Sequence, residues 1–253
     1  SFRTGGPADC LLIPETAQGI PEIVGAINNT GVPLTVIGGG TNLLVGDRGI
    51  RGAVLAVREN GAGAGAIVVE KEGISHADAS VKKERFIQFA LEQGYGGTEF
   101  MAGIPGCLGG GIIMNAGTFM GWFADIVKSL DLLTAEGERT EQAVTPAMSS
   151  YRKLLIPEGS IVLGARFQLP RCDDPAEMRR RIDEILADRK KKHPLDYPSA
   201  GSVFKNPEGH SSWQLIDRSG LKGHVIGGAR VSDLHTNFII NAGGATSRDI
   251  RDL

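Results

Sequence analysis

The sequence predicts a fold that mixes helices and strands, and three observations support this prediction. Strand and helix patterns alternate along the 253 residues, starting with a strand at 9–13, a helix at 16–29 and a strand at 34–37. A hydrophobic content of 41% with 22% charged residues is typical of a globular protein with a substantial core. The 36 glycines, about twice the average share of ~7%, gather in clusters, which favours tight turns and close contacts between backbone and ligand.

Glycines mark the ends of the two helices expected in the first half of the chain. Thr16 can cap the first helix and Gly31 can end it. The second helix is expected at residues 80–93, where an apolar face includes Phe86 and Gly94 follows the last turn. Apolar runs predict the remaining strands of this part, with a loose glycine and alanine turn at 61–66 between the first two: 53–57, 67–70, 128–133 and 160–169.

The composition changes at residues 170–175, and this is the expected domain boundary. Pro175 suits the first turn of a helix that runs to about residue 192 and stops before Pro194. Short strands and one or two short helices are expected to alternate beyond this helix, at 202–204, 213–218, 229–231 and 238–240.

Charge and cysteine usage exclude several classes of protein. The net charge of −2 gives no electrostatic footprint for nucleic acid or an anionic membrane. No apolar run approaches the ~18 residues of a membrane span, and the start of the chain lacks a signal-peptide pattern. The three cysteines are far apart, which fits reduced thiols in the cytoplasm and argues against a disulfide framework. No obligate protein partner is evident.

Several catalytic fingerprints are also missing. GxGxxG, GxxxxGK[ST], GxSxG and HExxH do not occur. The five histidines are isolated and lack carboxylates at ligand spacing, so no metal site is expected. Without a metal, a cysteine pair or an activated nucleophile, a bound redox cofactor would have to supply any demanding chemistry.

The first glycine cluster directly follows the strand expected before it. Gly38, Gly39 and Gly40 lose more backbone entropy on folding than other residues, and Thr41 and Asn42 follow them. A backbone that approaches an anion closely would offset that loss, because successive N–H groups can then point into one concavity. A plain turn between two strands is the alternative, and this segment alone fits both interpretations.

A second glycine cluster at residues 103–111 leads into Met114-Asn115-Ala116-Gly117. Two loops that are both rich in backbone donors suit a long ligand with a diphosphate and an aromatic head better than a mononucleotide. A flavin dinucleotide fits that description.

Further along the chain, Ser202 lies among small residues before the turn Lys205-Asn206-Pro207. Serines in such places usually cap a turn. The alternative is a hydroxyl that donates a proton, and a neutral serine can do so only to a strongly basic group such as a carbanion or enolate.

Six motifs occur in one order along the chain: Phe2-Arg3-Thr4-Gly5-Gly6-Pro7-Ala8, Gly38-Gly39-Gly40-Thr41-Asn42-Leu43-Leu44-Val45, Gly103-Ile104-Pro105-Gly106 with Met114-Asn115-Ala116-Gly117, Tyr151-Arg152, Ala200-Gly201-Ser202-Val203-Phe204-Lys205-Asn206-Pro207, and His235-Thr236-Asn237-Phe238-Ile239-Ile240-Asn241. Together they resemble UDP-N-acetylenolpyruvoylglucosamine reductase, the flavoenzyme family that completes UDP-N-acetylmuramate for bacterial peptidoglycan. The short spacing from Tyr151 to Ser202 resembles the subtype without an inserted substrate-covering loop.

The resemblance implies an α+β fold of the vanillyl-alcohol-oxidase type. Residues 1–170 would bind FAD in two subdomains, roughly 1–57 and 58–170, and residues 171–253 would form an α+β substrate domain. NADPH would be the reductant of FAD, and hydride would then pass to the enolpyruvyl methylene carbon of a UDP-sugar.

The resemblance also implies roles for individual residues. Ser202 would protonate the adjacent carbon, and Arg152 would stabilise the enolate oxygens, although a surface ion pair is a simpler interpretation of an arginine. Tyr151, Lys192 and Asn206 would bind the substrate, with two other lysines directly before Lys192. The FAD-binding residues would come from the two glycine clusters and the segment after the second: Gly38, Gly39, Gly40, Thr41, Asn42, Leu43, Gly103, Ile104, Pro105, Gly106, Gly109, Gly110, Asn115, Ala116 and Gly117.

The chain departs from the family pattern in three ways. The family uses a glutamate near its C-terminus as a third catalytic group, and after Ser202 this chain has only Glu208, in a different context. Leu154 stands where relatives tend to have serine. The chain starts just inside the family's usual N-terminus and stops within what resembles a helix, so we expect both ends to be truncated. Another FAD oxidoreductase of the same fold and a non-catalytic flavin- or nucleotide-binding module stay open as alternatives.

Overall fold

A computed structural model describes residues 1–59 and 65–253. Most of the turn expected at 61–66, namely 61–64, lies outside the described residues. The chain divides into two compact units. Unit 1 comprises Ser1–Asp9, Gly40–Arg51 and Ala187–Leu253, and unit 2 comprises Cys10–Gly39 and Gly52–Leu186. The domain boundary expected at residue 170 and the subdomain limits stay predictions.

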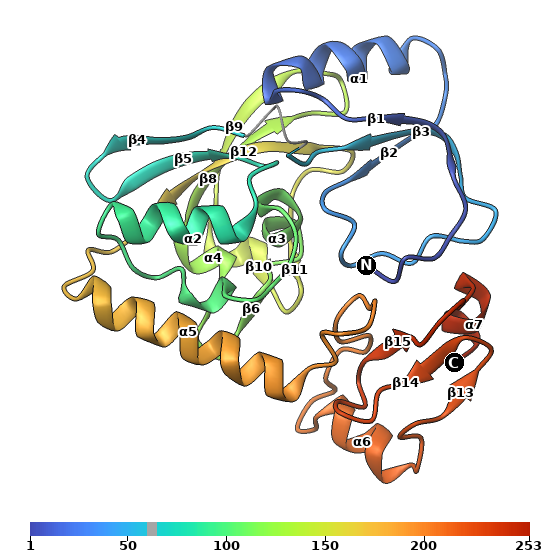
Figure 1. Ribbon diagram of the computed structural model, residues 1–253. Coiled ribbons are helices and arrows are strands. Elements are labelled where there is room, and N and C mark those ends of the chain that lie inside the picture. The colour runs from blue at the N-terminus through green and yellow to red at the C-terminus, as the bar shows by residue number, and fades with distance from the viewer. Residues whose placement is uncertain (60–64) are drawn as a thin grey trace. The chain divides into compact units, whose positions relative to one another are not determined.

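Unit 2 is built on a five-stranded antiparallel sheet (Figure 1). Its strands, in spatial order, are β4 (Ile67–Lys71), β5 (Ile74–Asp78), β12 (Ile161–Gln168), β8 (Val127–Leu133) and β9 (Arg139–Ala143). Near the end of β12, Phe167 is fully buried while Arg166 is partly exposed. Because neighbouring side chains on a strand point to opposite faces, the sheet has an apolar face and a polar face.

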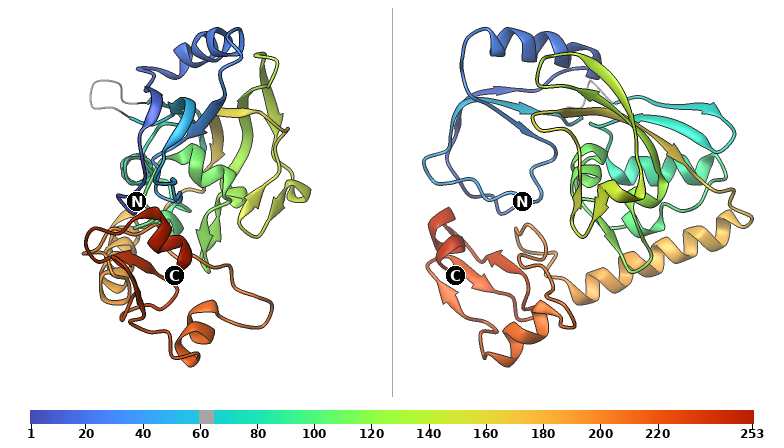
Figure 2. Two further views of the ribbon diagram at one scale, coloured as in Figure 1. Left: turned by 90° about the vertical axis from the view of Figure 1, so that its right-hand side faces the viewer. Right: turned by 180° about the vertical axis from the view of Figure 1, so that it is seen from behind.

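Helices cover the apolar face of this sheet (Figures 1 and 2). They are α2 (Lys83–Glu92), α3 (Leu108–Ile113) and α4 (Phe123–Ile126). The rings of Phe86 on α2 and Phe167 on β12 have centroids 4.5 Å apart, and Phe123 and Leu130 are fully buried in the same core. This core fixes where α3, which follows the second glycine turn, can lie.

A second sheet has the order β1-β3-β2. Its elements are β1 (Ala8–Leu12), a short turn of 3-10 helix η1 (Ala17–Gly19), α1 (Ile20–Asn28), β2 (Leu34–Ile37) and β3 (Ile50–Ala56). β2 and β3 run parallel, with Leu34 opposite Ala53 and Ile37 opposite Ala56. The end of β2 therefore delivers the chain to Gly38 at the edge of this sheet.

Unit 1 contains a small antiparallel sheet with two helices. Its elements are α6 (Ser212–Arg218), β13 (Val225–Ile226), β14 (Ala229–Val231), β15 (Ile239–Asn241) and α7 (Ser247–Asp252). Its apolar core includes Phe2, Ile239 and Ile250. The carboxylate of Asp47 accepts hydrogen bonds from the N–H groups of Ser247 at 2.7 Å and Arg248 at 3.1 Å, and this lowers the pKa of Asp47.

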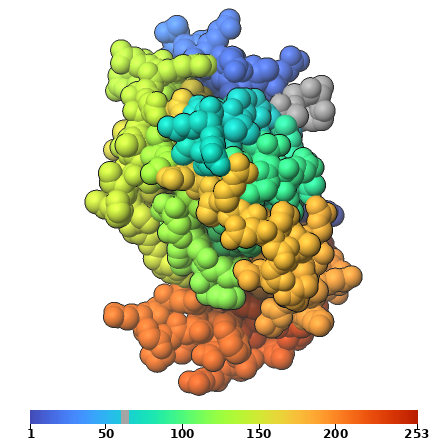
Figure 3. All heavy atoms as spheres, turned by 90° about the vertical axis from the view of Figure 1, so that its left-hand side faces the viewer, coloured from blue at the N-terminus to red at the C-terminus, as the bar shows by residue number. Residues whose placement is uncertain are grey.

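The long helix α5 (Pro175–Lys192) belongs to unit 2 as far as Leu186 and to unit 1 from Ala187. Met178 and Ile182 pack into the core of unit 2, and Figure 3 shows this part of the helix, in gold, against the segment that contains α2. Among the helices of residues 1–59 and 65–253, none has the length and apolar character that a membrane span requires.

Short elements complete the described chain: η2 (Glu99–Met101), β6 (Gly117–Thr118), β7 (Gly121–Trp122), η3 (Pro146–Met148), β10 (Ser149–Ser150) and β11 (Lys153–Leu154). β6 pairs with β7, and β10 pairs with β11.

The structure corrects three expectations about local structure. The helix expected at 16–29 is split into η1 and α1, and Thr16 makes no side-chain cap hydrogen bond. The second glycine cluster, which was expected to be a loop, contains the helix α3. A Cβ on Gly109 in this helix would lie 2.8 Å from the Cβ of Ala79, so tight packing explains why this residue is a glycine. In place of a strand at 202–204 there is one isolated bridge between Ser202 and Phe238.

Candidate active site

The first glycine segment presents bare backbone donors. Within the described part of the chain, the N–H groups of Gly38, Gly39 and Gly40 donate to no protein acceptor. Gly40 has a φ of +64°, a left-handed conformation that glycine adopts without steric cost. Unpaired N–H groups on successive residues are an arrangement that can bind an anion.

The second glycine segment bends at Gly103 and Gly106, whose φ angles are +70° and +101°. Ile104 and Pro105 form the turn between them, and Pro105 is exposed. The next glycines belong to α3, where the N–H of Gly109 donates to the Ala79 carbonyl at 2.9 Å and is therefore occupied. Gly110 is exposed.

Unit 2 brings the two glycine segments into contact. A Cβ added to Gly39 would lie 3.0 Å from the Cα of Gly106, and one on Gly38 would lie 3.8 Å from the N of Gly110. Side chains at these positions would therefore fill the space between the two backbones. Unpaired backbone donors with no side chain between them fit the diphosphate of a dinucleotide.

Asn115 connects the second glycine segment to the turn that carries Arg152. Its side chain is buried, with 3% of the residue exposed, and its φ is +37°. Nδ2 donates to Ser149 Oγ at 3.0 Å and to the Ser150 carbonyl at 3.2 Å, while Oδ1 accepts from the Ala124 N–H at 3.0 Å. The buried Ala116 and Gly117 follow it into β6.

Tyr151 and Arg152 are the two turn residues between β10 and β11. Arg152 has a φ of +63°, an uncommon conformation for a residue with a side chain. Its guanidinium carbon lies 5.8 Å from the centroid of the Tyr151 ring. No carboxylate forms an ion pair with Arg152 among the residues that the structure describes, so the surface ion pair is not what holds it there.

In unit 1, the segment around Ser202 is held by a buried asparagine. Asn237, 4% exposed, accepts from the Phe204 N–H at 2.9 Å through Oδ1 and donates to the Phe204 carbonyl at 2.9 Å through Nδ2. Its own carbonyl accepts from the Val203 N–H at 2.9 Å. Ser202 itself is exposed at the start of this segment.

The other expected site residues of unit 1 have less distinctive surroundings. Thr41, Asn42 and Leu43 follow Gly40, and the last two are exposed. Asn206 Oδ1 accepts from the Ser212 N–H at 3.0 Å, so part of this side chain supports the start of α6. Lys192 forms an exposed ion pair of 2.8 Å with Asp188. Their binding roles stay predictions.

A cavity of about 260 Å³ lies at the end of α5, lined among others by Lys190, His193 and Arg230. Burial, helped by the positive charge of Arg189, lowers the pKa of His193 to about 4. Burial also lowers the pKa of His235, whose ring lies 5.5 Å from that of His193. Both imidazoles are therefore neutral near pH 7.

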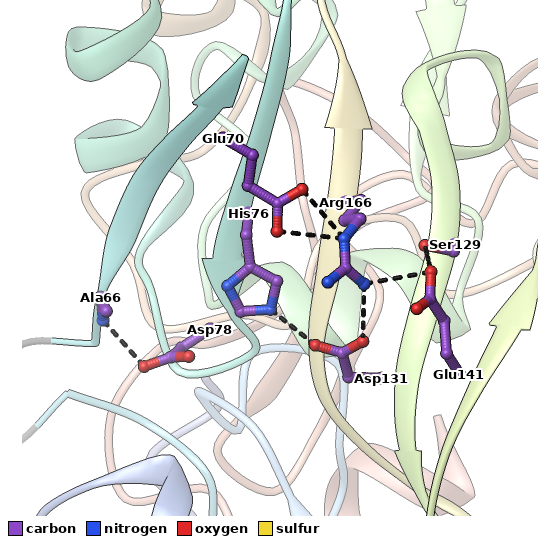
Figure 4. A network of polar contacts seen from close by, with 8 residues as sticks. All are labelled: Ala66, Glu70, His76, Asp78, Ser129, Asp131, Glu141 and Arg166. Atoms are coloured by element: carbon purple, nitrogen blue, oxygen red, sulfur yellow. Dashed lines mark hydrogen bonds and ion pairs between the residues drawn. The ribbon is translucent and has the colours of Figure 1, made fainter.

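The polar face of the five-stranded sheet carries a network centred on Arg166 (Figure 4). Its Nε donates to Glu70 at 3.0 Å, and Nη1 lies 3.2 Å from Asp131 and 3.1 Å from Glu141. His76 Nε2 lies 2.7 Å from Asp131. The charges satisfy one another within the sheet, which indicates a structural role.

Sequence reasoning missed two residues that organise these segments, Asn237 and Lys83. Lys83 is buried beside the second glycine segment and its Nζ donates to the Pro105 carbonyl at 2.8 Å. Both had a signal in the sequence. Asn237 lies in a quoted motif, and Lys83 shares the helix face of Phe86 and Ala90 at three- and seven-residue spacing.

Comparison with known proteins supports a dinucleotide site. A family model described as an FAD binding domain matches residues 8–142, and one described as the UDP-N-acetylenolpyruvoylglucosamine reductase C-terminal domain matches residues 193–253. The expected α+β fold with an FAD-binding domain is confirmed. An FAD-binding domain followed by such a C-terminal domain defines a flavin-dependent oxidoreductase.

Full-length relatives identify the family. UDP-N-acetylenolpyruvoylglucosamine reductases from Pelobacter propionicus and Latilactobacillus sakei are 41% and 42% identical, covering 100% and 98% of this chain and 84% and 80% of theirs. The crystal structure of the Thermus caldophilus reductase (MurB) matches with a TM-score of 0.83 at 33% identity, over 99% of this chain and 88% of that one. The chain belongs to the UDP-N-acetylenolpyruvoylglucosamine reductase family, which decides against the two alternative hypotheses.

Proposed function

We propose that Arg152 and Ser202 carry out the second half of this family's reaction, in which the enolpyruvyl group of a UDP-sugar is reduced. The chain is an NADPH-dependent, FAD-containing reductase that converts UDP-N-acetylglucosamine enolpyruvate to UDP-N-acetylmuramate for peptidoglycan. Bound FAD, once reduced by NADPH, supplies the hydride. The residues of the chain must then bind the substrate, stabilise the charge that develops and deliver a proton.

The proposal depends mainly on the conformation and the contacts of Arg152. Hydride addition to the methylene carbon places negative charge on the neighbouring carbon and on the carboxylate conjugated with it. A guanidinium is always charged and presents a planar set of donors that matches two carboxylate oxygens. Arg152 is held in a left-handed turn by the Asn115 network and is paired with no carboxylate in the described part of the chain. It is therefore available to an external carboxylate.

Ser202 is proposed as the proton donor. Its hydroxyl is a weak acid, but the enolate carbon is basic enough to take the proton as the new C–H bond forms. The serine oxygen then recovers a proton from solvent. Asn237 and Phe238 fix the backbone on both sides of the hydroxyl, which supports a role that needs a defined position.

The remaining assignments are part of the same proposal. The glycine segments, with Thr41, Asn42, Leu43 and Asn115, hold FAD, and Tyr151, Lys192 and Asn206 bind the UDP-sugar. Residues 1–170 and 171–253 are the proposed FAD and substrate domains. The cysteines Cys10, Cys107 and Cys172 are free thiols, which supports the cytoplasm as the compartment.

Replacement of Ser202 separates the two half-reactions. Ser202→Ala should leave flavin reduction by NADPH within about twofold of the wild type, because no proton of the serine is used there. Reoxidation of the reduced flavin by the enolpyruvyl substrate should fall by about 10²- to 10⁴-fold. Anaerobic stopped-flow absorbance measures both steps, with Ser211→Ala as a matched control. Equal losses in both steps would contradict the proton-donor role.

A further inference from the structure

Lys83 is a buried lysine that the proposed reaction does not use. It is the first residue of α2, and only 3% of its surface is exposed. Its side chain passes close to α3, since a Cβ on Gly111 would lie 2.8 Å from Lys83 Cε. Lysines are almost never buried so completely unless something holds their charge.

Lys83 fixes two successive peptide groups of the second glycine segment. Its Nζ donates to the Pro105 carbonyl at 2.8 Å, and its backbone N–H donates to the Gly106 carbonyl at 3.2 Å. In a trans peptide the N–H points away from the carbonyl of the same group, and the described chain has no cis peptide bond. The N–H groups of Gly106 and Cys107 therefore point away from Lys83.

Gly39 of the first glycine segment lies beside these two peptide groups. A Cβ on Gly39 would be 3.0 Å from Gly106 Cα and 3.6 Å from Cys107 N. Neither N–H donates to an acceptor within residues 1–59 and 65–253. Lys83 thus fixes the orientation of two peptide groups whose N–H donors are unpaired and lie near the first glycine segment.

The ammonium group has no carboxylate partner in the part of the chain that the structure describes. Burial lowers the pKa of Lys83 to about 8, while the nearby Glu84 and the Cys107 thiol raise it in part. The other charged groups near this cluster are Lys82 and Glu59, the latter paired with Arg85. A bound diphosphate is the negative charge that would stabilise the protonated lysine.

We propose that Lys83 is a positioning residue for the cofactor, which orients the Pro105-Gly106 turn and places an ammonium group behind the FAD diphosphate. The inference rests on the assignment of the two glycine segments to FAD, and it is independent of the roles proposed for Arg152 and Ser202. The tests of this inference measure FAD binding in the absence of substrate. Their results therefore do not depend on whether Arg152 and Ser202 have the proposed roles.

The first test is FAD affinity of the apoprotein, measured by quenching of flavin fluorescence. Lys83→Met keeps the length of the side chain but removes the hydrogen bond and the charge. We expect the FAD dissociation constant to rise about 10- to 100-fold, because a charge-assisted hydrogen bond is lost. Lys82→Met, an exposed neighbour with the same charge change, should bind as the wild type does. Riboflavin, which has no diphosphate, should lose much less affinity than FAD.

The second test is the pH dependence of the same constant. Because FAD favours the protonated lysine, wild-type affinity should be constant from pH 6 to about 7.5 and fall up to tenfold per pH unit above pH 8. Lys83→Met should show no such fall. Cys107→Ser should retain it, which would separate the lysine from the neighbouring thiol.

The outcomes are distinct. The proposal is supported if Lys83→Met binds FAD at least tenfold more weakly than the wild type and if the FAD affinity of this variant does not change with pH. A wild-type profile that is flat between pH 7 and 9.5 overturns the role of the charge, whatever the variants do. If Lys83→Met does not fold, Lys83→Gln keeps a donor without the charge, and its binding FAD with the wild-type pH profile would also overturn it.

Discussion

Arg152 and Ser202 lie in two segments that are held in place by different contacts. The Arg152 turn in unit 2 is held by the side chain of Asn115, which follows the second glycine segment. The Ser202 segment in unit 1 is held by Asn237 and Phe238, which directly precede β15 of a small sheet. Both side chains thus depend on one buried amide, but only Asn115 is also a proposed FAD-binding residue.

This difference separates the two side chains functionally. A change at Asn115 should disturb FAD binding as well as charge stabilisation by Arg152, because Asn115 is a proposed FAD-binding residue and also holds the Arg152 turn. A change at the support of Ser202 should disturb proton delivery alone. Arg152 and Asn115 both have a positive φ. Such a conformation costs of order 1–3 kcal/mol for each residue and persists only where the surroundings fix it. The two residues are therefore expected to depend on each other's contacts.

Apart from Ser202→Ala, the largest effect is expected at Arg152. Arg152→Met should lower the rate of flavin reoxidation by the enolpyruvyl substrate about 10²- to 10³-fold, because the developing carboxylate charge loses its partner. Flavin reduction by NADPH should be unchanged. Stopped-flow absorbance measures both, and Lys153→Met on the same hairpin is the control. A loss confined to substrate affinity, with the rate at saturation intact, would mean that Arg152 only binds the ground state.

The next largest effects are expected at Asn115 and Asn237, and they should differ from each other. Asn115→Ala leaves the Ala124 N–H and the Ser150 carbonyl unpaired and should cost about 2–4 kcal/mol of unfolding free energy together with weaker FAD binding. Asn237→Ala should cost less, because Phe204 is 54% exposed and water can replace the amide. It should slow only reoxidation by substrate.

Urea unfolding and FAD titration of both variants measure these effects, with Asn28→Ala at the exposed end of α1 as a control. The comparison fails if Asn237→Ala weakens FAD binding as much as Asn115→Ala does.

The sequence predicts some of these elements well because local signals agree. The strand at Leu34–Ile37 and the helix at Pro175–Lys192 have the predicted limits, since an apolar run ends at glycines and a proline starts the helix. α3 could not be predicted, because its glycines are poor helix formers, and the tight packing that excludes a side chain at Gly109 and Gly111 depends on the tertiary fold. β9 at Arg139–Ala143 lacks an apolar pattern.

The candidate site was predictable to a similar degree. Glycine clustering indicated the two backbone segments, but their contact through Gly39 and Gly106 depends on the tertiary fold. Arg152 was found through family resemblance, because a single arginine has no periodic pattern. Ser202 was noticed in its own segment, but only the resemblance favoured the proton donor over a turn serine. Lys83 lay on the predicted buried face of a helix, and a charged residue at that position was the missed signal.

Acid should affect unit 1 through His193, which belongs to the same unit as Ser202. The unfolded chain binds a proton at the usual histidine pKa near 6.5, whereas the folded imidazole does so only near pH 4. The stability that neutral His193 contributes is therefore complete above pH 6.5 and is lost as the pH falls toward 4. We expect a loss of about 1–2 kcal/mol at pH 5.

The two tryptophans allow this to be measured, since Trp122 lies in unit 2 and Trp213 in unit 1. Urea unfolding at pH 7 and pH 5 would be followed by Trp213 fluorescence in a Trp122→Phe background. His193→Leu should reduce the difference between the two pH values, and the remaining part is expected from His235, whose pKa is also lowered by burial. An unchanged difference would assign the acid sensitivity to other groups.

The smallest effect is expected at Arg166, which is the counterpart of Arg152 in the same unit. Arg166 is about one-third exposed and already satisfied by Glu70, Asp131 and Glu141. Arg166→Met should therefore cost about 1 kcal/mol or less of unfolding free energy, less still in high salt, and should leave FAD affinity and both half-reactions unchanged. Thermal unfolding at two salt concentrations and the same stopped-flow assay test this. If Arg166→Met lost as much activity as Arg152→Met, ion pairing within the sheet would not separate a structural arginine from a catalytic one.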